Sequence, residues 1–265
     1  MRDVVFRDRA VYLERGDALV LADLHVGRGE GSDVEFPLGE ASDLAERLSA
    51  LVEAFAPSRV VVAGDVLHQF ARVSDRVDRS LSDLVAVCHD AGARPVLVRG
   101  NHDTQLASVW DGTIHDAYEI ELDEAGEDED DADGGAPRST DESSYLPASA
   151  SGPVVVRHGH EAPPADEADR AGLYVIGHDH PTVEIQGGRR RPCYLYVPDA
   201  VRGTPALVLP AFNRLPAGVT VGGMSGDDFQ SPFVTAANPL RPVVWDPETD
   251  DRLSFPPLGE FRRML

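Results

Sequence analysis

The sequence predicts an α/β protein in which two β-sheets pack face to face, with helices on the outside. In the first hundred residues, short apolar runs alternate with segments of helical periodicity, which is the pattern of parallel βαβ units. From residue 153 onward the apolar runs are separated by turn residues, which indicates hairpins rather than helices. A chain of 265 residues can bury a substantial core, and we expect residues 1–265 to form one domain.

The first half of the chain contains the predicted βαβ units. The strand expected at Ala18–Ala22 is continuously apolar, as is typical of a strand covered on both faces. Apolar residues then recur at helical spacing in two segments, the first of which ends at Pro57. The expected elements are strands at Val4–Phe6, Val11–Leu13, Ala18–Ala22, Arg59–Ala63 and Pro95–Arg99, and helices at Leu38–Phe55 and around Val77–Cys88.

The second half is expected to be richer in strands. An acidic stretch at residues 123–152 begins with twenty residues that include ten acidic residues and one arginine, and we expect a disordered insertion there. The last forty residues, rich in proline and glycine, predict no clear elements. The predicted strands are Ala117–Leu122, Pro153–Arg157, Leu173–Ile176, Thr182–Ile185, Tyr194–Val197, Ala206–Leu209 and a weaker Val219–Val221.

The charge of the chain is unusual. Its net charge is −22, and all 24 basic residues are arginine. An acidic excess without lysine resembles the surfaces of proteins from extreme halophiles, where salt screens self-repulsion. The alternative, an acidic partner-binding protein, is disfavoured because the acidic residues are spread along the whole chain. In molar salt the Debye length is about 3 Å, so an acidic exterior does not exclude a polyanionic substrate.

The sequence predicts a cytoplasmic protein. The N-terminus lacks the apolar segment of a signal peptide, and no apolar run approaches the roughly 18 residues of a membrane span. Cys88 and Cys193 are far apart in sequence and do not suggest a disulfide framework, which fits a reducing compartment. Cys88 falls on the apolar face of a predicted helix, where we expect a buried thiol.

Five polar motifs each follow a short apolar run. In chain order they are Asp23-Leu24-His25, Gly64-Asp65-Val66-Leu67-His68, Gly100-Asn101-His102-Asp103, His158-Gly159-His160 and Gly177-His178-Asp179-His180. Ligand sites in parallel sheets lie beyond the carboxyl ends of the strands, which is where these motifs fall. We therefore expect the five loops to meet at one edge. An aspartate after a strand is often only a turn or a helix cap, so no single motif is decisive.

The motifs offer aspartate, asparagine and histidine but no cysteine. Such ligands suit Mn²⁺, Fe, Zn²⁺ or Co²⁺ rather than a cysteine-rich structural zinc site or a calcium site. Seven ligands are too many for one transition ion and suit two ions that share a carboxylate. Two ions about 3.5–4 Å apart can share a hydroxide and stabilise the charge that develops during in-line attack on phosphorus. We expect two divalent ions, with Mn²⁺ preferred.

In the order and content of these motifs, the sequence resembles the calcineurin-like metallophosphoesterases. The family pattern D-x-H, G-D, G-N-H-[DE], H and G-H-x-H is matched at every block between Asp23 and His180. The resemblance implies the four-layer αββα fold of that family and a metal-dependent phosphoric ester hydrolase. It also implies the ligands of the two ions. The first ion would be bound by Asp23, His25, Asp65 and His180, and the second by Asp65 as a bridge with Asn101, His158 and His178.

The same resemblance implies catalytic roles for two residues that are not ligands. A metal-bridging hydroxide would attack phosphorus while His102 assists the leaving-group oxygen, and Asp103 would orient His102 through the other ring nitrogen. The first histidine of the family's H-G-H motif is the usual ligand, so His158 is preferred over His160.

Three residues are expected near the substrate. The guanidinium of Arg28 suits phosphate oxygens, although an exposed arginine on an acidic surface is an equally good interpretation. His68 and His160 are better placed to face the substrate or to support the ligands. His89 and His115 match no motif and are expected at the surface.

A narrower resemblance is to the branch that contains the DNA-ligase-associated, endonuclease-like phosphoesterases. It is carried by residues 22–28, residues 64–68 and the run Leu207–Phe212, with Arg28 where that branch often has lysine. The acidic insertion departs from the compact members of the branch. This resemblance implies a phosphodiesterase or nuclease acting on a nucleic acid or nucleotide. A phosphomonoesterase is the alternative, and a non-catalytic scaffold is disfavoured because His102 and all seven ligands are present.

Overall fold

A computed structural model describes residues 4–31, 39–68, 73–123, 152–185 and 188–263. The acidic insertion that the sequence predicts at residues 123–152 lies outside the described residues, apart from its two ends. None of the described helices combines the length and the apolar character that a membrane-spanning helix requires.

The first large sheet has six strands in the order β1-β2-β3-β4-β5-β6. The first two strands form an antiparallel hairpin, and the last four run parallel, so that the carboxyl ends of the latter share one edge. The strands are β1 (Val4–Arg7), β2 (Ala10–Leu13), β3 (Ala18–Leu21), β4 (Arg59–Ala63), β5 (Arg94–Val98) and β6 (Ile114–His115). Two helices, α1 (Glu40–Phe55) and α2 (Asp75–Asp90), form the crossovers between parallel strands.

The second large sheet has seven strands in the order β16-β15-β12-β13-β9-β8-β7. Three neighbouring strands, β13, β9 and β8, run parallel to one another. The strands are β7 (Tyr118–Ile120), β8 (Val154–Arg157), β9 (Leu173–Ile176), β12 (Tyr194–Val201), β13 (Thr204–Val208), β15 (Arg241–Asp246) and β16 (Asp251–Ser254).

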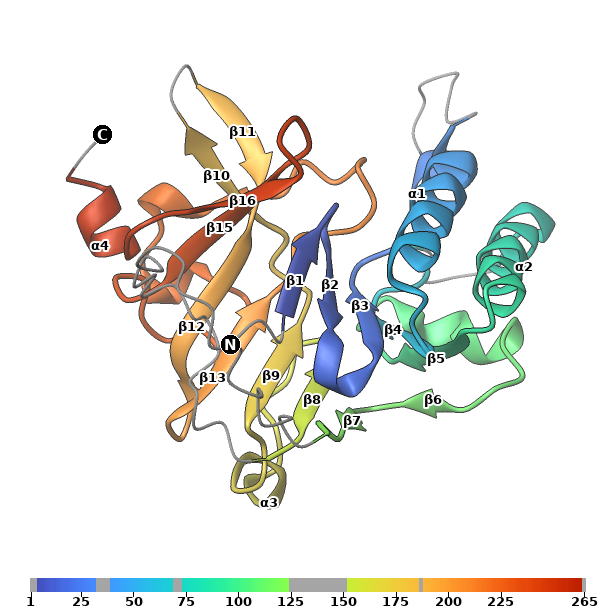
Figure 1. Ribbon diagram of the computed structural model, residues 1–265, viewed down its shortest axis with the longest axis horizontal. Coiled ribbons are helices and arrows are strands. Elements are labelled where there is room, and N and C mark those ends of the chain that lie inside the picture. The colour runs from blue at the N-terminus through green and yellow to red at the C-terminus, as the bar shows by residue number, and fades with distance from the viewer. Residues whose placement is uncertain (1–3, 32–38, 69–72, 124–151, 186–187, 264–265) are drawn as a thin grey trace, which may run out of the picture.

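Smaller elements complete the described fold. A small sheet has the order β11-β10-β14, with β10 (Pro181–Ile185), β11 (Arg189–Pro192) and β14 (Val219–Thr220). The short helices are α3 (Ala165–Ala168) and α4 (Leu258–Phe261), and the 3₁₀ turns are η1 (Glu14–Gly16), η2 (Arg28–Gly31), η3 (Asp103–Ser108), η4 (Val221–Gly223) and η5 (Gly226–Asp228). Figure 1 shows α1 and α2 together on one side of the molecule and α4 on the other.

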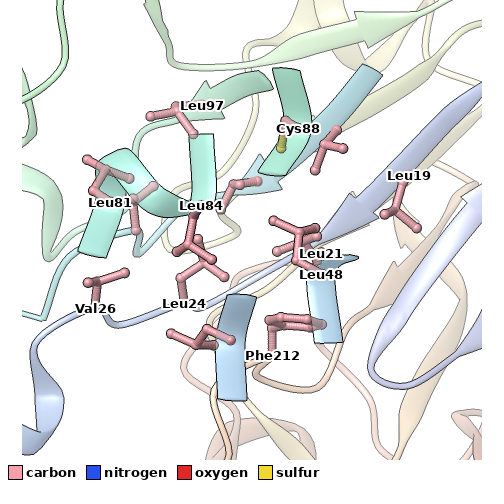
Figure 2. Packing of buried hydrophobic residues seen from close by; sticks show 14 of the residues in the cluster. Leu19, Leu21, Leu24, Val26, Leu48, Leu81, Leu84, Cys88, Leu97 and Phe212 are labelled. Carbon is pink, nitrogen blue, oxygen red and sulfur yellow. The ribbon is translucent and has the colours of Figure 1, made fainter. Parts of the chain in front are cut away.

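Three hydrophobic clusters hold these layers together. In β3, Leu19 and Leu21 face the helices while Val20 faces the second large sheet, which explains why the strand is apolar throughout. Figure 2 shows the helix-side cluster, in which Leu48 of α1 and Leu84 of α2 pack with residues of the sheet. Truncating such a buried leucine to alanine costs about 2–5 kcal/mol of stability. The third cluster covers the far face of the second sheet and includes Phe261 of α4. The predicted fold class is therefore confirmed.

The prediction that the last forty residues form no clear elements is wrong. β15 and β16 pair as an antiparallel hairpin that extends the second sheet from β12. Val243 packs in the cluster between the large sheets, and Val244 packs in the cluster on the far face. β15 was not predicted because Pro242 and Pro247 lie close to both valines, and proline is rare inside strands.

Candidate metal centre

The five motifs lie at the carboxyl ends of β3, β4, β5, β8 and β9, and the structure brings their loops together. Neighbouring loops hydrogen-bond through their backbones. The Asp23 N–H donates to the Gly64 carbonyl at 3.1 Å, and the Gly177 N–H donates to the His158 carbonyl at 3.0 Å. The backbone contacts therefore fix the positions from which the side chains project.

Most of the predicted ligands have an unusual backbone. A left-handed φ in a non-glycine residue costs about 1–3 kcal/mol and is concentrated at functional sites. Here it turns the chain sharply at the end of a strand. The five predicted ligands with this conformation are Asp23 (57°), His25 (44°), Asp65 (50°), His178 (75°) and His180 (46°).

Two motif glycines stand where a side chain would collide with a neighbouring loop. A Cβ added to Gly100 would lie 2.2 Å from both the backbone nitrogen and Oδ1 of Asp65. A Cβ added to Gly177 would lie 2.6 Å from Oδ2 of Asp23. Glycine is therefore what lets each loop approach the neighbouring carboxylate.

One group of candidate ligands consists of Asp23, His25 and His180. Their ligand atoms all lie within 4.8 Å of one another. His180 Nε2 is 3.4 Å from Asp23 Oδ1 and 3.2 Å from His25 Nε2. Two ring nitrogens and a carboxylate oxygen that face the same space are an arrangement that suits a divalent transition ion.

A second group surrounds His158. Its Nδ1 lies 3.1 Å from the Ala63 carbonyl, which accepts the proton of that nitrogen and leaves a lone pair on Nε2. This Nε2 faces Asp65 Oδ1 at 3.3 Å and Asn101 Oδ1 at 2.9 Å, with His178 Nδ1 at 3.2 Å. When Asp65 is ionised, the lone pair of Nε2 and these two oxygens have no proton to share, so a cation bound between them would satisfy all three atoms. His160 lies beside this group, with its ring 5.1 Å from that of His158.

Two carboxylates lie between these groups. Asp65 presents Oδ1 to His158 at 3.3 Å and Oδ2 to His25 at 3.9 Å. Asp23 lies within 4.8 Å of both His180 and His158. The sequence prediction singled out Asp65 as the shared carboxylate, and the structure places Asp23 between the groups as well.

The pKa values of the candidate ligands also suit a bound cation. Burial raises the pKa of Asp65 to about 8, and the charge of Asp23 adds to this shift. Burial lowers the pKa of His25 to about 3 and the pKa values of His158 and His178 to about 4. The three imidazoles are therefore neutral at pH 7, as metal ligands must be. A divalent ion would also relieve the repulsion between the two carboxylates.

The model of one protein family matches most of this chain. It is the family described as calcineurin-like phosphoesterase, and the match covers residues 17–217. The chain belongs to this family. It is thus a metal-dependent phosphoric ester hydrolase, and the donor groups above are its candidate metal site.

Two solved structures are among those similar to this metallophosphoesterase. The crystal structure of the Pseudomonas putida nuclease MPE is 20% identical, with a TM-score of 0.50, and the match covers 89% of this chain and 88% of that one. The phosphoesterase Yfce from E. coli is 14% identical, with a TM-score of 0.42, and the match covers 90% of this chain and 98% of that one. No curated protein matches the sequence.

His102 of this metallophosphoesterase lies beside the ligand groups. Its Nε2 is 3.9 Å from Asp65 Oδ2, and its ring centroid is 5.3 Å from that of His25. Burial lowers the pKa of the His102 imidazole, while a hydrogen bond to the His68 backbone and the charge of Asp103 oppose this shift. The histidine is thus close to the ligands while its protonation depends on its neighbours.

Asp103 is fully buried and ties the motif loops together. Its carboxylate accepts hydrogen bonds from the backbone N–H groups of Gly100 at 2.8 Å, Leu67 at 2.9 Å and Val66 at 3.3 Å. The sequence analysis expected Asp103 to orient His102 through a ring nitrogen. In the structure the Asp103 carboxylate accepts these three hydrogen bonds from the backbone, and its charge works against the lowering of the His102 pKa by burial.

The three residues predicted near the substrate lie around the metallophosphoesterase site. The His68 ring stacks on that of His102, with 5.7 Å between centroids. Burial and then the charge of Arg28 lower the pKa of His68. The pKa of His180 is raised, because burial and the charge of Arg28 are outweighed by the charge and hydrogen bond of Asp23. The Arg28 N–H donates to the His25 carbonyl at 3.0 Å, which places Arg28 next to the first motif. His160 lines a cavity of about 310 Å³ beside His158.

Sequence reasoning missed Asn213 and Glu40. The Asn213 side-chain amide donates to the Leu24 carbonyl at 2.8 Å and to the Glu40 carboxylate at 2.9 Å. Glu40 also accepts the backbone N–H groups of Arg28 and Gly29. Together these residues hold the loop that carries Asp23 and His25. The available signal was the apolar run before Asn213, because β13 ends at the same edge as the motif strands.

Proposed function

We propose that this protein is a phosphodiesterase with two divalent ions, and that a nucleic acid or nucleotide is its substrate. The observation that carries this proposal is the position of Asp65 between two groups of nitrogen and oxygen donors, with His102 beside it. Such an arrangement fits two ions that share a carboxylate, next to a histidine that is left for acid–base work.

The ligands present on this chain fit that assignment. Bound divalent ions supply Lewis acidity toward phosphoryl oxygens and lower the pKa of water, and Mn²⁺ is preferred, with Fe, Zn²⁺ and Co²⁺ as alternatives. The Ala63 carbonyl fixes the tautomer of His158. One ion would be held by Asp23, His25, Asp65 and His180, and the other by Asp65, Asn101, His158 and His178.

The remaining groups orient the ester and move a proton. His102 would donate the proton of its imidazole to the leaving-group oxygen, since an imidazole titrates near neutral pH. Burial lowers the pKa of His102, and the charge of Asp103 opposes this shift in favour of the protonated imidazole that this step requires. Arg28 would bind a phosphoryl oxygen, because its charge acts on His68 and His180 at the site.

A diester substrate is supported by space beside the ligands. The cavity of about 310 Å³ next to His158 is also lined by His160, by Arg99 with its ion-pair partner Asp116, and by Arg157 and Glu161. The Arg157 guanidinium is held by Glu167 through two hydrogen bonds, of 2.7 and 2.8 Å. This cavity can take a second ester substituent, which a phosphomonoester lacks. The motif resemblance to nuclease-like phosphoesterases supports the same choice.

The test is hydrolysis of bis-p-nitrophenyl phosphate beside p-nitrophenyl phosphate, with added Mn²⁺ and with chelated enzyme as the control. We expect Mn²⁺-dependent hydrolysis with a higher kcat/KM for the diester. A higher kcat/KM for the monoester would identify a phosphomonoesterase instead. Failure to hydrolyse either ester with metal bound would contradict the proposal.

We also propose that the enzyme works in a salt-rich cytoplasm. This is supported by the net charge of −22, the absence of lysine and the two free, buried cysteines. The assay is therefore run in both dilute buffer and molar KCl, and we expect the higher activity in molar KCl.

A further inference from the structure

A second cavity, of about 250 Å³, lies outside the ligand groups. Its wall comes from the β1–β2 turn, β11, β12, β15 and the segment that follows β13. Its charged lining consists of Arg9, Arg191, Arg214 and Asp8. Prolines and the aromatic rings of Tyr194 and Trp245 form the rest of the wall. Because the chain has a net charge of −22, a cavity lined by three arginines and one acidic residue is unusual for this protein.

The single acidic residue of this lining is already neutralised. Asp8 binds the Arg47 guanidinium through two hydrogen bonds, with 2.7 Å from Nε and 3.0 Å from Nη2. Arg214 pairs with Asp43 at 2.8 Å. The cavity therefore keeps an excess of positive charge.

Two arginines supply that excess. Arg9 donates from Nη1 to the carbonyls of Ala211 and Asn213, at 3.0 and 2.9 Å, and pairs with no carboxylate among the described residues. Burial lowers the pKa of Arg9 to about 10, and the charges of Arg47 and Arg214 add to the shift. Within the described part of the chain, the Arg191 side chain makes no ion pair or hydrogen bond. Both guanidinium groups have donors left for an anion.

The cavity and the metal motif share one segment of chain. The carbonyls that hold Arg9 belong to residues 211 and 213. The same segment binds the first metal motif, since the Phe212 N–H donates to the Ala22 carbonyl at 2.8 Å and the Asn213 amide donates to the Leu24 carbonyl at 2.8 Å. Asp8 and Arg9 are held in left-handed conformations, with φ of 41° and 67°. Residues 211–213 therefore join the cavity to the first metal motif.

We propose that this cavity binds a nucleotide unit of a single-stranded nucleic acid that flanks the scissile phosphodiester. The inference rests on the phosphodiesterase function proposed above. Guanidinium groups match phosphate oxygens in geometry and charge, so Arg9 and Arg191 would hold the phosphate. The base would lie against the Trp245 ring, a contact worth about 1–3 kcal/mol per base. A single strand is required because the bases of a duplex are already paired and stacked.

The first test measures binding without turnover. The chain has two tryptophans, so Trp110→Phe leaves Trp245 as the only fluorescent indole. This variant, loaded with metal, is titrated with a phosphorothioate tetrathymidylate that resists hydrolysis. We expect saturable quenching of Trp245, weakened at least about tenfold by Arg191→Gln. Arg190→Gln is the matched control, because Arg190 is exposed and points away from Arg191 along the strand.

Three results of this titration would overturn the inference. They are unchanged Trp245 emission, equal affinities for the Arg191→Gln and Arg190→Gln variants, and inorganic phosphate binding as tightly as the tetrathymidylate. The last result would show a simple anion site with no contribution from the base.

The second test separates the cavity from the metal centre. With unmodified tetrathymidylate, we expect Arg191→Gln to raise KM at least about tenfold, because one charge-assisted phosphate contact is lost. With bis-p-nitrophenyl phosphate, kcat/KM should stay unchanged, since this small diester does not reach the cavity. Equal KM values for the variant and the wild type would overturn the inference. Failure of the wild type to hydrolyse any diester would instead refute the phosphodiesterase function, and Trp245 quenching would still report on the cavity.

Discussion

His158 and His102 illustrate how the surroundings of a histidine determine its role. The His158 side chain is 1% exposed, and the Ala63 carbonyl takes the proton of its Nδ1. It is therefore held as a neutral donor of one lone pair. The His102 side chain is 23% exposed, and burial lowers the pKa of its imidazole while the charge of Asp103 opposes this shift. It can exchange a proton with solvent or with a substrate, which a proton donor must do.

Replacing His102 by alanine should separate metal binding from turnover. We expect His102→Ala to keep both ions and to lose about 10²- to 10⁴-fold in kcat for the diester, because only the proton donor is removed. Metal content by mass spectrometry and steady-state kinetics check this. His89→Ala, at an exposed position of α2, is the control. Unchanged turnover in His102→Ala would remove this histidine from the mechanism.

The raised pKa of Asp65 gives the metal-free protein a defined pH dependence. Its native pKa of about 8 lies above its ordinary value of 3.8, so the native state keeps a proton that the unfolded chain loses. This stabilisation is complete below pH 3.8 and is lost as the pH rises to 8. The histidines with lowered pKa values act in the opposite direction near pH 6.5, so the Asp65 effect is taken as the difference between the wild type and Asp65→Asn. From pH 6.5 to 8 this difference in the free energy of unfolding should fall by about 1 kcal/mol per pH unit.

Urea unfolding of EDTA-treated protein at several pH values measures this slope. Asp65→Asn is the reference, because its amide does not titrate while the histidines remain. An equal slope in the wild type and in the variant would contradict the protonation of Asp65.

At the scale of elements, parallel strands bring the motifs to one edge, and glycines let the loops touch. The Gly64–Asp65 loop follows β4 and the Gly100–Asn101 loop follows β5, its direct neighbour in the sheet. The His102 N–H donates to Asp65 Oδ1 at 2.9 Å across this pair of loops. The geometry of the donor groups therefore depends on how closely two neighbouring loops approach.

Gly100→Ala should disturb this approach. The added Cβ would meet the backbone and the carboxylate of Asp65 at 2.2 Å, so one loop must move. We expect a loss of about 1–3 kcal/mol in stability together with weaker metal binding. Thermal unfolding and metal titration check this. Gly222→Ala is the control, since its Cβ would meet nothing within 4 Å. Full metal affinity in Gly100→Ala would show that the close approach is not needed.

At the scale of the whole molecule, we propose that the two large sheets form one folding unit. Residues of both sheets share the cluster between them, including Val20 and Val96 from the first sheet and Val175 and Leu207 from the second. The two cysteines lie in the two other clusters, Cys88 beside the helices and Cys193 on the far face. Each cysteine therefore reports on one side of the molecule.

Thiol labelling should show whether the two sides open together. Burial raises the pKa of the Cys88 thiol to about 12 and also raises the pKa of the Cys193 thiol, so neither reacts in the native state. We expect iodoacetamide to modify both cysteines at the same rate across a urea series, as resolved by peptide mass spectrometry. Labelling of one cysteine at a lower urea concentration would indicate two independent units.

The sequence was informative where periodicity and motifs were strong. The buried runs Arg59–Ala63 and Leu173–Ile176 match β4 and β9. The hairpin of β15 and β16 was missed because prolines surround Val243 and Val244. The contacts of Asn213 with the first metal motif could not be predicted, because they join residues almost 190 positions apart. For the same reason, the cavity lined by Arg9 and Arg191 appears only once the chain is folded.

The measurement that tests the two-ion centre most directly is the metal content of the wild type and of Asp65→Asn after loading with Mn²⁺ and removal of free ion. We predict two ions per wild-type chain and loss of occupancy in Asp65→Asn, because this carboxylate faces both donor groups. Asp83→Asn, at an exposed position of α2, should keep two ions. A single ion in the wild type, or two ions in Asp65→Asn, would contradict the shared-carboxylate centre.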